Sequence, residues 1–309
     1  MTENKDENQR EDTTRLISEE ELEAVRLMHT ETRRACLIVV SGGDIGREYT
    51  IEGEEVVIGR CESADIRINS RLVSRRHAAI RTVRENEAVF YVLRDLDSMN
   101  GTLLNNAAIK SANLHEGDKI QIGEVVFKFG YQDALDEQFH KEIHRLIHYD
   151  RLTGLMTMES FRKVLEDTIH CAQPEEVFTL SMNDLDGLKR VNDTYGHLAG
   201  RMVVESMGKM IRETLRQNDI PALYGGDETI ILYPNTTITE AREIAEKLRT
   251  LIESRVFEHG GNTFGVTISQ GLAEWPKHGV SSEEIIAAAD AALYRAKAAG
   301  RNCVVIAGS

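Results

Sequence analysis

The sequence Tyr-Gly-Gly-Asp-Glu at residues 224–228 carries the most chemical information in this chain. It stands between two apolar runs, which predicts a tight turn between two strands. Glycine lacks a Cβ, so Gly225 and Gly226 can adopt positive φ and let a ligand lie against the main chain. Carboxylate oxygens suit hard cations such as Mg²⁺. Asp227 and Glu228 therefore indicate a site for a metal-bound phosphate, although an isolated turn of this kind is more often an ordinary acidic hairpin.

Two further acids end the apolar run 178–186. Asp184 and Asp186 are two residues apart on a predicted strand, so their side chains share a face. If this strand lies beside the glycine turn, Asp184 and Asp227 can bridge one or two cations. A pair of Mg²⁺ ions would neutralise a triphosphate and assist in-line attack at phosphorus.

Lys297 and Arg301 are four residues apart near the C-terminus and share a helix face. Two cations so placed suit a polyphosphate. The alternative is a solvated basic face.

The composition limits the partners. The 309 residues carry a formal net charge of −14, which argues against nucleic acid or an anionic membrane as partner but allows a nucleotide escorted by Mg²⁺. The four cysteines show no paired framework and suit a reducing compartment. With neither a secretory signal nor a membrane-spanning apolar run, we expect a cytoplasmic protein.

The chain divides into four segments with different patterns. Residues 1–35 are polar and predict a flexible tail. Residues 36–130 contain short β-branched runs separated by turn residues, which predicts an all-β sandwich. Residues 131–149 have a helical apolar period and predict a linker helix. Residues 150–309 alternate helices and strands and predict an α/β (α+β) domain.

Within that last segment we expect a defined series of elements. Helices are expected at 160–170, 198–215, 238–255 and 282–299, strands at 178–184 and 263–273, and a hairpin at 222–233.

The linker helix carries a second periodic set. His140, His144 and His148 recur every fourth residue and share a face. We interpret this face as solvated, in preference to a metal or pH-sensing site, because the sequence shows no completing ligand shell.

Five motifs in the last segment resemble, in order, those of the GGDEF diguanylate cyclases. They begin at Asp150, Asp184, Tyr224, Val266 and Asp290. The resemblance implies a nucleotidyl-cyclase-like fold in which two GTP molecules, one on each of two facing domains of a homodimer, condense into cyclic di-GMP with release of pyrophosphate.

The resemblance also implies residue roles. Asp184 and the carbonyl of Leu185 would hold Mg²⁺, with Mn²⁺ as an alternative. Asp227 would bind metal and help activate the ribose 3′-hydroxyl, and Glu228 would support the metal site.

Other residues would bind the substrate and the product. Asn192 would read the guanine edge, and Lys297 and Arg301 would hold the β- and γ-phosphates. Arg216 and Asp219 match the family's product-inhibition motif, where cyclic di-GMP would bind; a surface ion pair is the alternative.

Three positions depart from the family pattern: Arg201 replaces a guanine-contacting Asp, Leu223 an Arg, and Thr229 a Phe. Arginine cannot accept the hydrogen bonds that guanine offers. These departures support an alternative function, a degenerate domain that senses GTP or cyclic di-GMP.

Residues 36–130 resemble a forkhead-associated (FHA) domain through Ile58-Gly-Arg, Ser74-Arg-Arg-His and Asn100-Gly-Thr. The resemblance implies phosphothreonine binding. Arg60 and Ser74 would grip the phosphate, with Arg75 assisting, and Asn100 would hold the ligand backbone. His77 would brace the loop.

The tail offers a phosphopeptide of its own. Thr13 and Thr14 each have an aliphatic residue three positions later, a position that FHA domains often select. We hypothesise that a Ser/Thr kinase phosphorylates one of them and that the FHA domain captures it, in cis or from a dimer partner. A phosphothreonine peptide of another protein is the other possible ligand. The alternative is a disordered leader.

Overall fold

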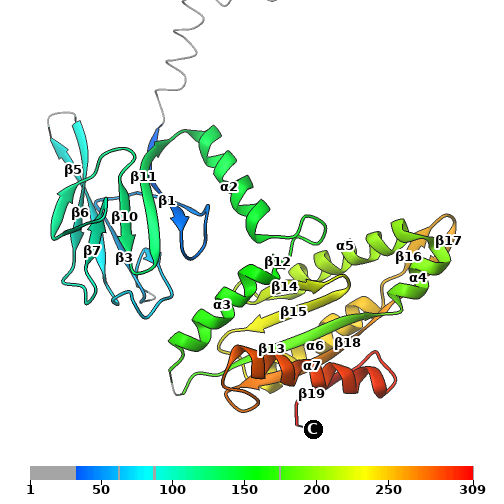
Figure 1. Cartoon of the computed structure of the whole chain (residues 1–309). Helices are drawn as coiled ribbons and strands as arrows, with labels where there is room; N and C mark the ends of the chain where they lie inside the picture. The colour runs from blue at the N-terminus through cyan, green and yellow to red at the C-terminus, as the bar shows by residue number, and fades with distance from the viewer. Residues whose placement is uncertain (1–32, 62, 86–87, 174, 309) are drawn as a thin grey trace, which may run out of the picture.

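The computed structural model describes residues 33–308 except 62, 86–87 and 174. Thr13 and Thr14 lie outside the described residues. Figure 1 shows a β-rich region at the N-terminal side, a single helix α2 (Ala134–His148) leaving it, and an α/β region beyond.

Two sheets make up the β-rich region. In the described residues, one has the strand order β2-β1-β11-β10-β7-β8 and the other β4-β3-β5-β6-β9. The strands are β1 Arg34–Ser41, β2 Glu48–Thr50, β3 Glu55–Gly59, β4 Ile66–Arg67, β5 Ala78–Glu85, β6 Ala88–Asp95, β7 Thr102–Leu104, β8 Ala107–Ile109, β9 Ser111–Asn113, β10 Lys119–Ile122 and β11 Val125–Gln132.

Alternating apolar residues of the two sheets form one core. Leu37 on β1 and Phe127 on β11 face Ile58 on β3 and Ile80 on β5, and all four are at most 1% exposed. The period of two in these strands puts apolar side chains on the inner faces. The predicted all-β sandwich is confirmed.

The α/β region has a mixed sheet with the order β12-β14-β15-β13-β18-β19 among the described residues. Helices α3 and α7 pack on one face, and α4, α5 and α6 on the other. The elements are β12 Met156–Thr157, α3 Met158–Cys171, β13 Phe178–Asp186, α4 Leu188–Tyr195, α5 His197–Thr214, β14 Ile220–Gly225, β15 Glu228–Tyr233, α6 Ile238–Glu253, β16 Phe257–His259, β17 Asn262–Phe264, β18 Thr267–Trp275, α7 Ser282–Ala298 and β19 Val304–Ile306.

Two details differ from the expected elements. The strand expected at 263–273 is divided, because β17 turns back at Gly260 and Gly261, both at positive φ, to pair with β16. A short helix, α4, was not expected; it is bounded by Gly187 and Gly196, which also have positive φ.

Helix α2 corrects the interpretation of its histidines. His148 is only 8% exposed, and His144 20%, so this face is not solvated. Both rings lie against the β1–β2 loop, where Asp44 and the carbonyl of Ile45 accept hydrogen bonds. The face is buried because these acceptors, about a hundred residues earlier in the chain, satisfy the imidazole N–H groups.

The apolar side chains of α2 lie in solvent instead. Leu135 is 68% exposed, Phe139 61%, Ile147 45% and Leu146 42%. The helix therefore offers an apolar stripe that the described part of the chain leaves uncovered.

Among the described residues, every helix is too short or too polar to cross a membrane.

Candidate functional site

Three carboxylates meet where β13 and β15 run side by side. The antiparallel register pairs Asp184 with Glu228, and the turn between β14 and β15 brings Asp227 alongside, with Leu185 N donating to Asp227 O at 3.4 Å. The central position of β13 in the sheet fixes Asp184, since its backbone pairs with strands on both sides.

The charges at this site are suited to a bound cation. Burial raises the pKa of Asp184, and the neighbouring Asp227 adds to this, while an ion pair with Lys297 opposes it. The Lys297 Nζ lies 2.8 Å from Asp184 Oδ2. Burial, followed by repulsion from Asp184, also raises the pKa of Glu228. Three carboxylates here face the single ammonium group of Lys297. Carboxylate oxygens with this excess of negative charge fit a hard divalent ion such as Mg²⁺.

A hollow of about 790 Å³ lies beside the carboxylates. Among the residues predicted from the sequence, its lining includes Asp184, Leu185, Asp227, Lys297 and Arg301. Such a volume is in the range of nucleotide-sized pockets. The acids and the cations predicted for one site are thus brought together from β13, the glycine turn and α7.

The other predicted substrate residues lie outside that lining. Gly225 and Gly226 are exposed, and Gly226 has φ +48°. Asn192 lies on α4 and packs against Gly200 of α5, where a Cβ would collide with the Asn192 amide oxygen. Gly200 therefore lets α4 approach α5 closely.

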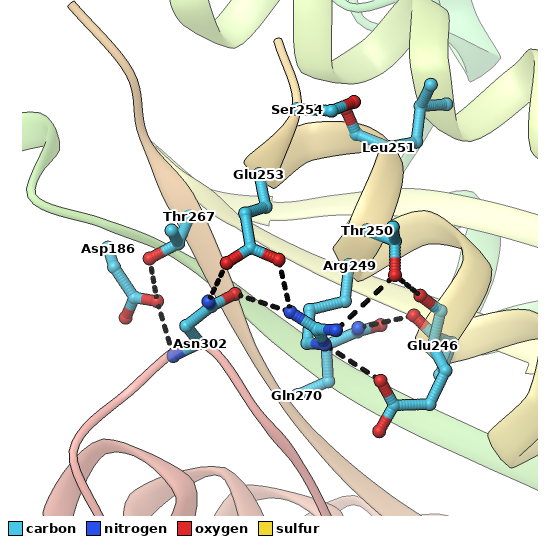
Figure 2. A network of polar contacts seen from close by, with 11 residues as sticks. Asp186, Glu246, Arg249, Thr250, Leu251, Glu253, Ser254, Thr267, Gln270 and Asn302 are labelled. Atoms are coloured by element: carbon cyan, nitrogen blue, oxygen red, sulfur yellow. Dashed lines mark hydrogen bonds and ion pairs between the residues drawn. The ribbon is translucent and has the colours of Figure 1, made fainter.

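The loop after α7 is held by a polar network that the sequence analysis did not identify. Asp186 accepts hydrogen bonds from Thr267 Oγ1 (2.8 Å), Ser269 Oγ (2.8 Å) and the backbone N–H of Asn302 (3.1 Å). Figure 2 shows Asp186 and Thr267 beside Asn302. Asp186 is only 8% exposed, so these bonds compensate its buried charge.

The Asn302 side chain is bound from the opposite direction. Arg249 Nη1 donates to its Oδ1 at 3.0 Å, and its Nδ2 donates to Glu253 Oε1 at 2.7 Å (Figure 2). Arg301 and Asn302 both have positive φ, which costs free energy for any residue other than glycine. The network fixes this strained loop and thereby the position of Arg301.

Two of the departures from the family pattern lie in different environments. Thr229 is fully buried at the start of β15, and its carbonyl accepts a hydrogen bond from Asn183 Nδ2 at 3.1 Å. The Asn183 amide on β13 also lies 3.4 Å from Thr229 Oγ1, so it binds both the backbone and the side chain at the start of β15. Arg201 is exposed on α5.

Arg216 and Asp219 form a closed pair before β14. Arg216 donates through Nε (3.2 Å) and Nη2 (3.0 Å) to the two oxygens of Asp219, which is buried. Nη2 also donates to Thr236 Oγ1 at 2.7 Å. Half of the guanidinium side chain stays exposed, so it is both oriented and accessible.

Three loops gather the predicted phosphopeptide residues at one end of the sandwich. Arg60 N donates to Ser74 O at 3.1 Å, and Ser74 Oγ accepts from Met99 N at 3.1 Å. Asn100 Nδ2 donates to Leu72 O at 2.7 Å. Within the described residues, the Arg60 Nε is buried without a hydrogen-bond acceptor. Such a donor fits an anionic ligand.

His77 braces these loops from below. It is fully buried, accepts from Ser74 N through Nδ1 at 3.1 Å, and therefore donates from Nε2 to Gly101 O at 3.0 Å. Arg75 is exposed beside it.

Comparison with known families assigns both regions. A family model described as "Diguanylate cyclase, GGDEF domain" matches residues 147–303, half of the chain. The chain belongs to the GGDEF family. A model of the FHA domain matches residues 56–123, so this GGDEF protein also carries an FHA domain.

Relatives and solved structures match the GGDEF part. Diguanylate cyclase A of Treponema denticola is 37% identical over 161 residues, 51% of this chain and 43% of that protein. The response regulator PleD of Caulobacter vibrioides is 33% identical over 159 residues, 50% of this chain and 35% of that protein. The match thus spans less than half of either relative's length.

Among solved structures, the coiled coil and GGDEF domain of DgcB from Caulobacter crescentus, in complex with c-di-GMP, is 28% identical. It has a TM-score of 0.51 and covers 56% of this chain and 92% of that chain. The GGDEF fold predicted from the sequence is confirmed.

Proposed function

We propose that this protein is a diguanylate cyclase that condenses two GTP molecules into cyclic di-GMP and pyrophosphate. The observation that carries the proposal is the meeting of Asp184, Asp227, Lys297 and Arg301 around one nucleotide-sized hollow in a GGDEF domain.

Substrate binding follows from the charges. Lys297 and Arg301 hold the β- and γ-phosphates, and Asn192 reads the guanine edge. Asp184, Asp227 and the Leu185 carbonyl would hold Mg²⁺, which neutralises phosphate charge and polarises the reacting phosphoryl group when bound. As GTP arrives, Lys297 exchanges its contact with Asp184 for a phosphate oxygen.

Proton transfer falls to the acids of the turn. Asp227 accepts the proton of the ribose 3′-hydroxyl, with Glu228 supporting the metal site. The freed 3′-oxygen forms a bond to the α-phosphorus of the other GTP, and the bond from that phosphorus to the pyrophosphate oxygen breaks. The same step then takes place with the roles of the two GTP molecules exchanged. Each step releases one pyrophosphate, and the second step closes the ring.

The reaction requires two domains that face one another, and we propose a homodimer joined along α2. The exposed stripe of Leu135, Phe139, Leu146 and Ile147 supports this, because pairing two such helices would remove apolar surface from water. Phe139→Glu is expected to give a monomer in light scattering and to lose cyclase activity. An active Phe139→Glu dimer would contradict this arrangement.

Regulation is proposed to come from the FHA domain. A phosphothreonine binds to four residues of this domain, Arg60, Ser74, Arg75 and Asn100. It comes either from Thr13 or Thr14 of the chain's own tail, phosphorylated by a Ser/Thr kinase, or from another protein. Capture of the chain's own tail need not be tight, since tethering raises its effective concentration.

A second candidate function is a degenerate sensor of GTP or cyclic di-GMP. The oriented and accessible Arg216 favours cyclic di-GMP binding, whether as product inhibition of an active enzyme or as the only remaining activity.

The deciding experiment incubates purified protein with Mg²⁺ and GTP, and in parallel with ATP present, and separates the nucleotides by chromatography. Asp227→Ala is the control. Cyclic di-GMP from the unmodified protein only would support the cyclase, and a mixed GMP–AMP product would mean that Arg201 relaxes base selection. No product, together with cyclic di-GMP binding that Arg216→Ala abolishes, would favour the sensor.

A further inference from the structure

A cluster of histidine and aspartate side chains lies where the FHA domain, helix α2 and the GGDEF domain meet. Asp44 Oδ1 lies 2.6 Å from His144 Nε2 and 3.4 Å from His148 Nε2. The carbonyl of Ile45 lies 2.7 Å from the same His148 nitrogen. Asp44, His144 and His148 each offer one ligand atom, and these three atoms lie within 4.8 Å of one another.

The surroundings orient each of these groups. The other oxygen of Asp44 is paired with Arg47 at 3.1 Å, so Oδ1 alone faces the histidines. The Nδ1 of His148 is 2.7 Å from Ser160 Oγ in the first turn of α3. Gly46, at φ +85°, brings the β1–β2 loop against α2, where its Cβ position lies 3.4 Å from the Cα of His144.

We propose that Asp44, His144, His148 and the Ile45 carbonyl bind one divalent transition-metal ion, with Zn²⁺ as the best match. Two imidazoles four residues apart on a helix can reach one ion together. A nitrogen and oxygen ligand set selects Zn²⁺ over Mg²⁺, which prefers oxygen alone.

The spacing suits such an ion. Ligand atoms of a tetrahedral zinc site lie about 3.3 Å apart, given metal–ligand distances of about 2.0 Å. The separations of 2.6, 2.7 and 3.4 Å lie within about 0.7 Å of this value, and the ligand atoms of Asp44, His144 and His148 all lie within 4.8 Å of one another. Both histidines would bind the metal through Nε2 as Nδ1–H tautomers. Ser160 Oγ would then accept a hydrogen bond from His148 Nδ1–H, the kind of contact that metal-bound histidines usually make.

Metal binding would fasten the FHA domain to the linker helix. The ligands come from the β1–β2 loop and from α2, and Ser160 ties the site to the GGDEF domain. The site is distinct from the carboxylates around Asp227, and it lies on the face of α2 that carries the histidines rather than on the apolar stripe.

The test uses Co²⁺ as a spectroscopic probe for Zn²⁺. The full chain, freed of metal with a chelator, is titrated with Co²⁺ in excess Mg²⁺, which saturates the carboxylate site. We expect one equivalent of Co²⁺ to give the intense visible absorption of tetrahedral coordination, and Zn²⁺ to displace it. Asp227→Ala should leave this band unchanged.

Variants on α2 provide the matched comparison. His144→Ala and His148→Ala should abolish the band, whereas His140→Ala, one turn earlier on the same helix, should retain it. Ser160→Ala should weaken Co²⁺ affinity about tenfold or more. If His148→Ala does not fold, the Co²⁺ band of His144→Ala decides the test, because His144 is more exposed and its loss disturbs the fold less. Absence of the band, or a band that survives His144→Ala, would overturn the proposal and leave the cluster as a hydrogen-bonded contact.

Discussion

The two candidate phosphate-binding sites of this protein are built from opposite charges. In the GGDEF domain, carboxylates stand near the ends of central strands. Burial, with a contribution from the neighbouring carboxylates, raises the pKa values of Asp184 and Glu228. In the FHA domain, arginines stand on loops at the end of a sandwich, and Arg60 keeps a buried donor without an acceptor. In the proposed function, the first region uses a cation to bind a polyphosphate, and the second binds a phosphate directly.

The supports of the two regions differ accordingly. The GGDEF site is fixed by strand pairing and by the Asp186–Asn302–Arg249 network, which holds a strained loop (Figure 2). The FHA loops are fixed by the buried imidazole of His77, by the buried carboxylate of Asp95, and by hydrogen bonds to backbone atoms. Asp95 accepts hydrogen bonds from Ser98 Oγ and Thr102 Oγ1. The candidate carboxylates of the GGDEF site therefore lie on paired strands or directly beside them, whereas the candidate phosphopeptide residues lie on loops.

The strongest test of this contrast is Asp184→Asn. Loss of one anionic oxygen ligand should lower the rate of cyclic di-GMP formation at least about a thousandfold, because metal-assisted charge stabilisation is worth several kcal/mol. Phosphopeptide binding to the FHA domain, measured by calorimetry, should not change. Glu213→Gln, an exposed acid on α5, is the matched control. A rate within tenfold of the unmodified protein would remove Asp184 from the site.

The converse test is Arg60→Ala. Affinity for a peptide of residues 8–19 phosphorylated at Thr13 or Thr14 should fall at least about thirtyfold, because a charge-assisted contact is lost. GTP turnover without peptide should be unchanged. Arg84 lies at the end of β5 that is far from the loop carrying Ser74 and Arg75. The Arg84→Ala variant should bind the peptide with unchanged affinity. Equal binding by both variants, or no binding by the unmodified protein, would contradict phosphothreonine recognition of this tail.

A smaller effect is expected from Asn302→Gly, which keeps the positive φ available but removes the side chain held by Arg249 and Glu253. The KM for GTP should rise about tenfold, since hydrogen bonds to charged groups contribute about 1.5–3 kcal/mol, with kcat little changed. Ser254→Ala, whose hydroxyl bonds only within its own turn, should not alter KM. An unchanged KM in Asn302→Gly would show that the network does not position Arg301.

The smallest effect concerns α3, where the two regions approach. Burial, with a contribution from Glu124 of the FHA domain, raises the pKa of Asp167 to about 6. The folded chain therefore retains a proton that the unfolded chain loses near pH 4, and the associated stability is full below about pH 4 and lost as the pH rises through about 6.

Asp167→Asn should then be more stable than the unmodified protein at pH 7.5 by on the order of 1 kcal/mol, after allowance for solvent screening, and equal to it near pH 4. Urea denaturation at the two pH values measures this, with Glu175→Gln, an exposed acid after α3, as control. A stability difference that does not depend on pH would mean that Asp167 does not titrate near pH 6 in the folded protein.

Local pattern was sufficient for much of the fold. The alternation of β-branched residues predicts the sandwich, and the apolar run before Asp184 predicts β13. The same local rules place Asp184 and Asp186 on one face and the acids of residues 227–228 on a turn. They do not reveal that Asn302 binds Arg249 and Glu253, because these partners are about fifty residues apart in sequence.

Helix α2 shows most clearly what sequence and tertiary structure each decide. Its period determines that His140, His144 and His148 share one face and that the apolar residues share another, because 3.6 residues per turn fixes both stripes. Which stripe is buried depends on the partner, and the β1–β2 loop supplies acceptors from Asp44 and Ile45 a hundred residues away. Only the folded chain brings these groups together, so the histidine face became the contact and the apolar face remained exposed.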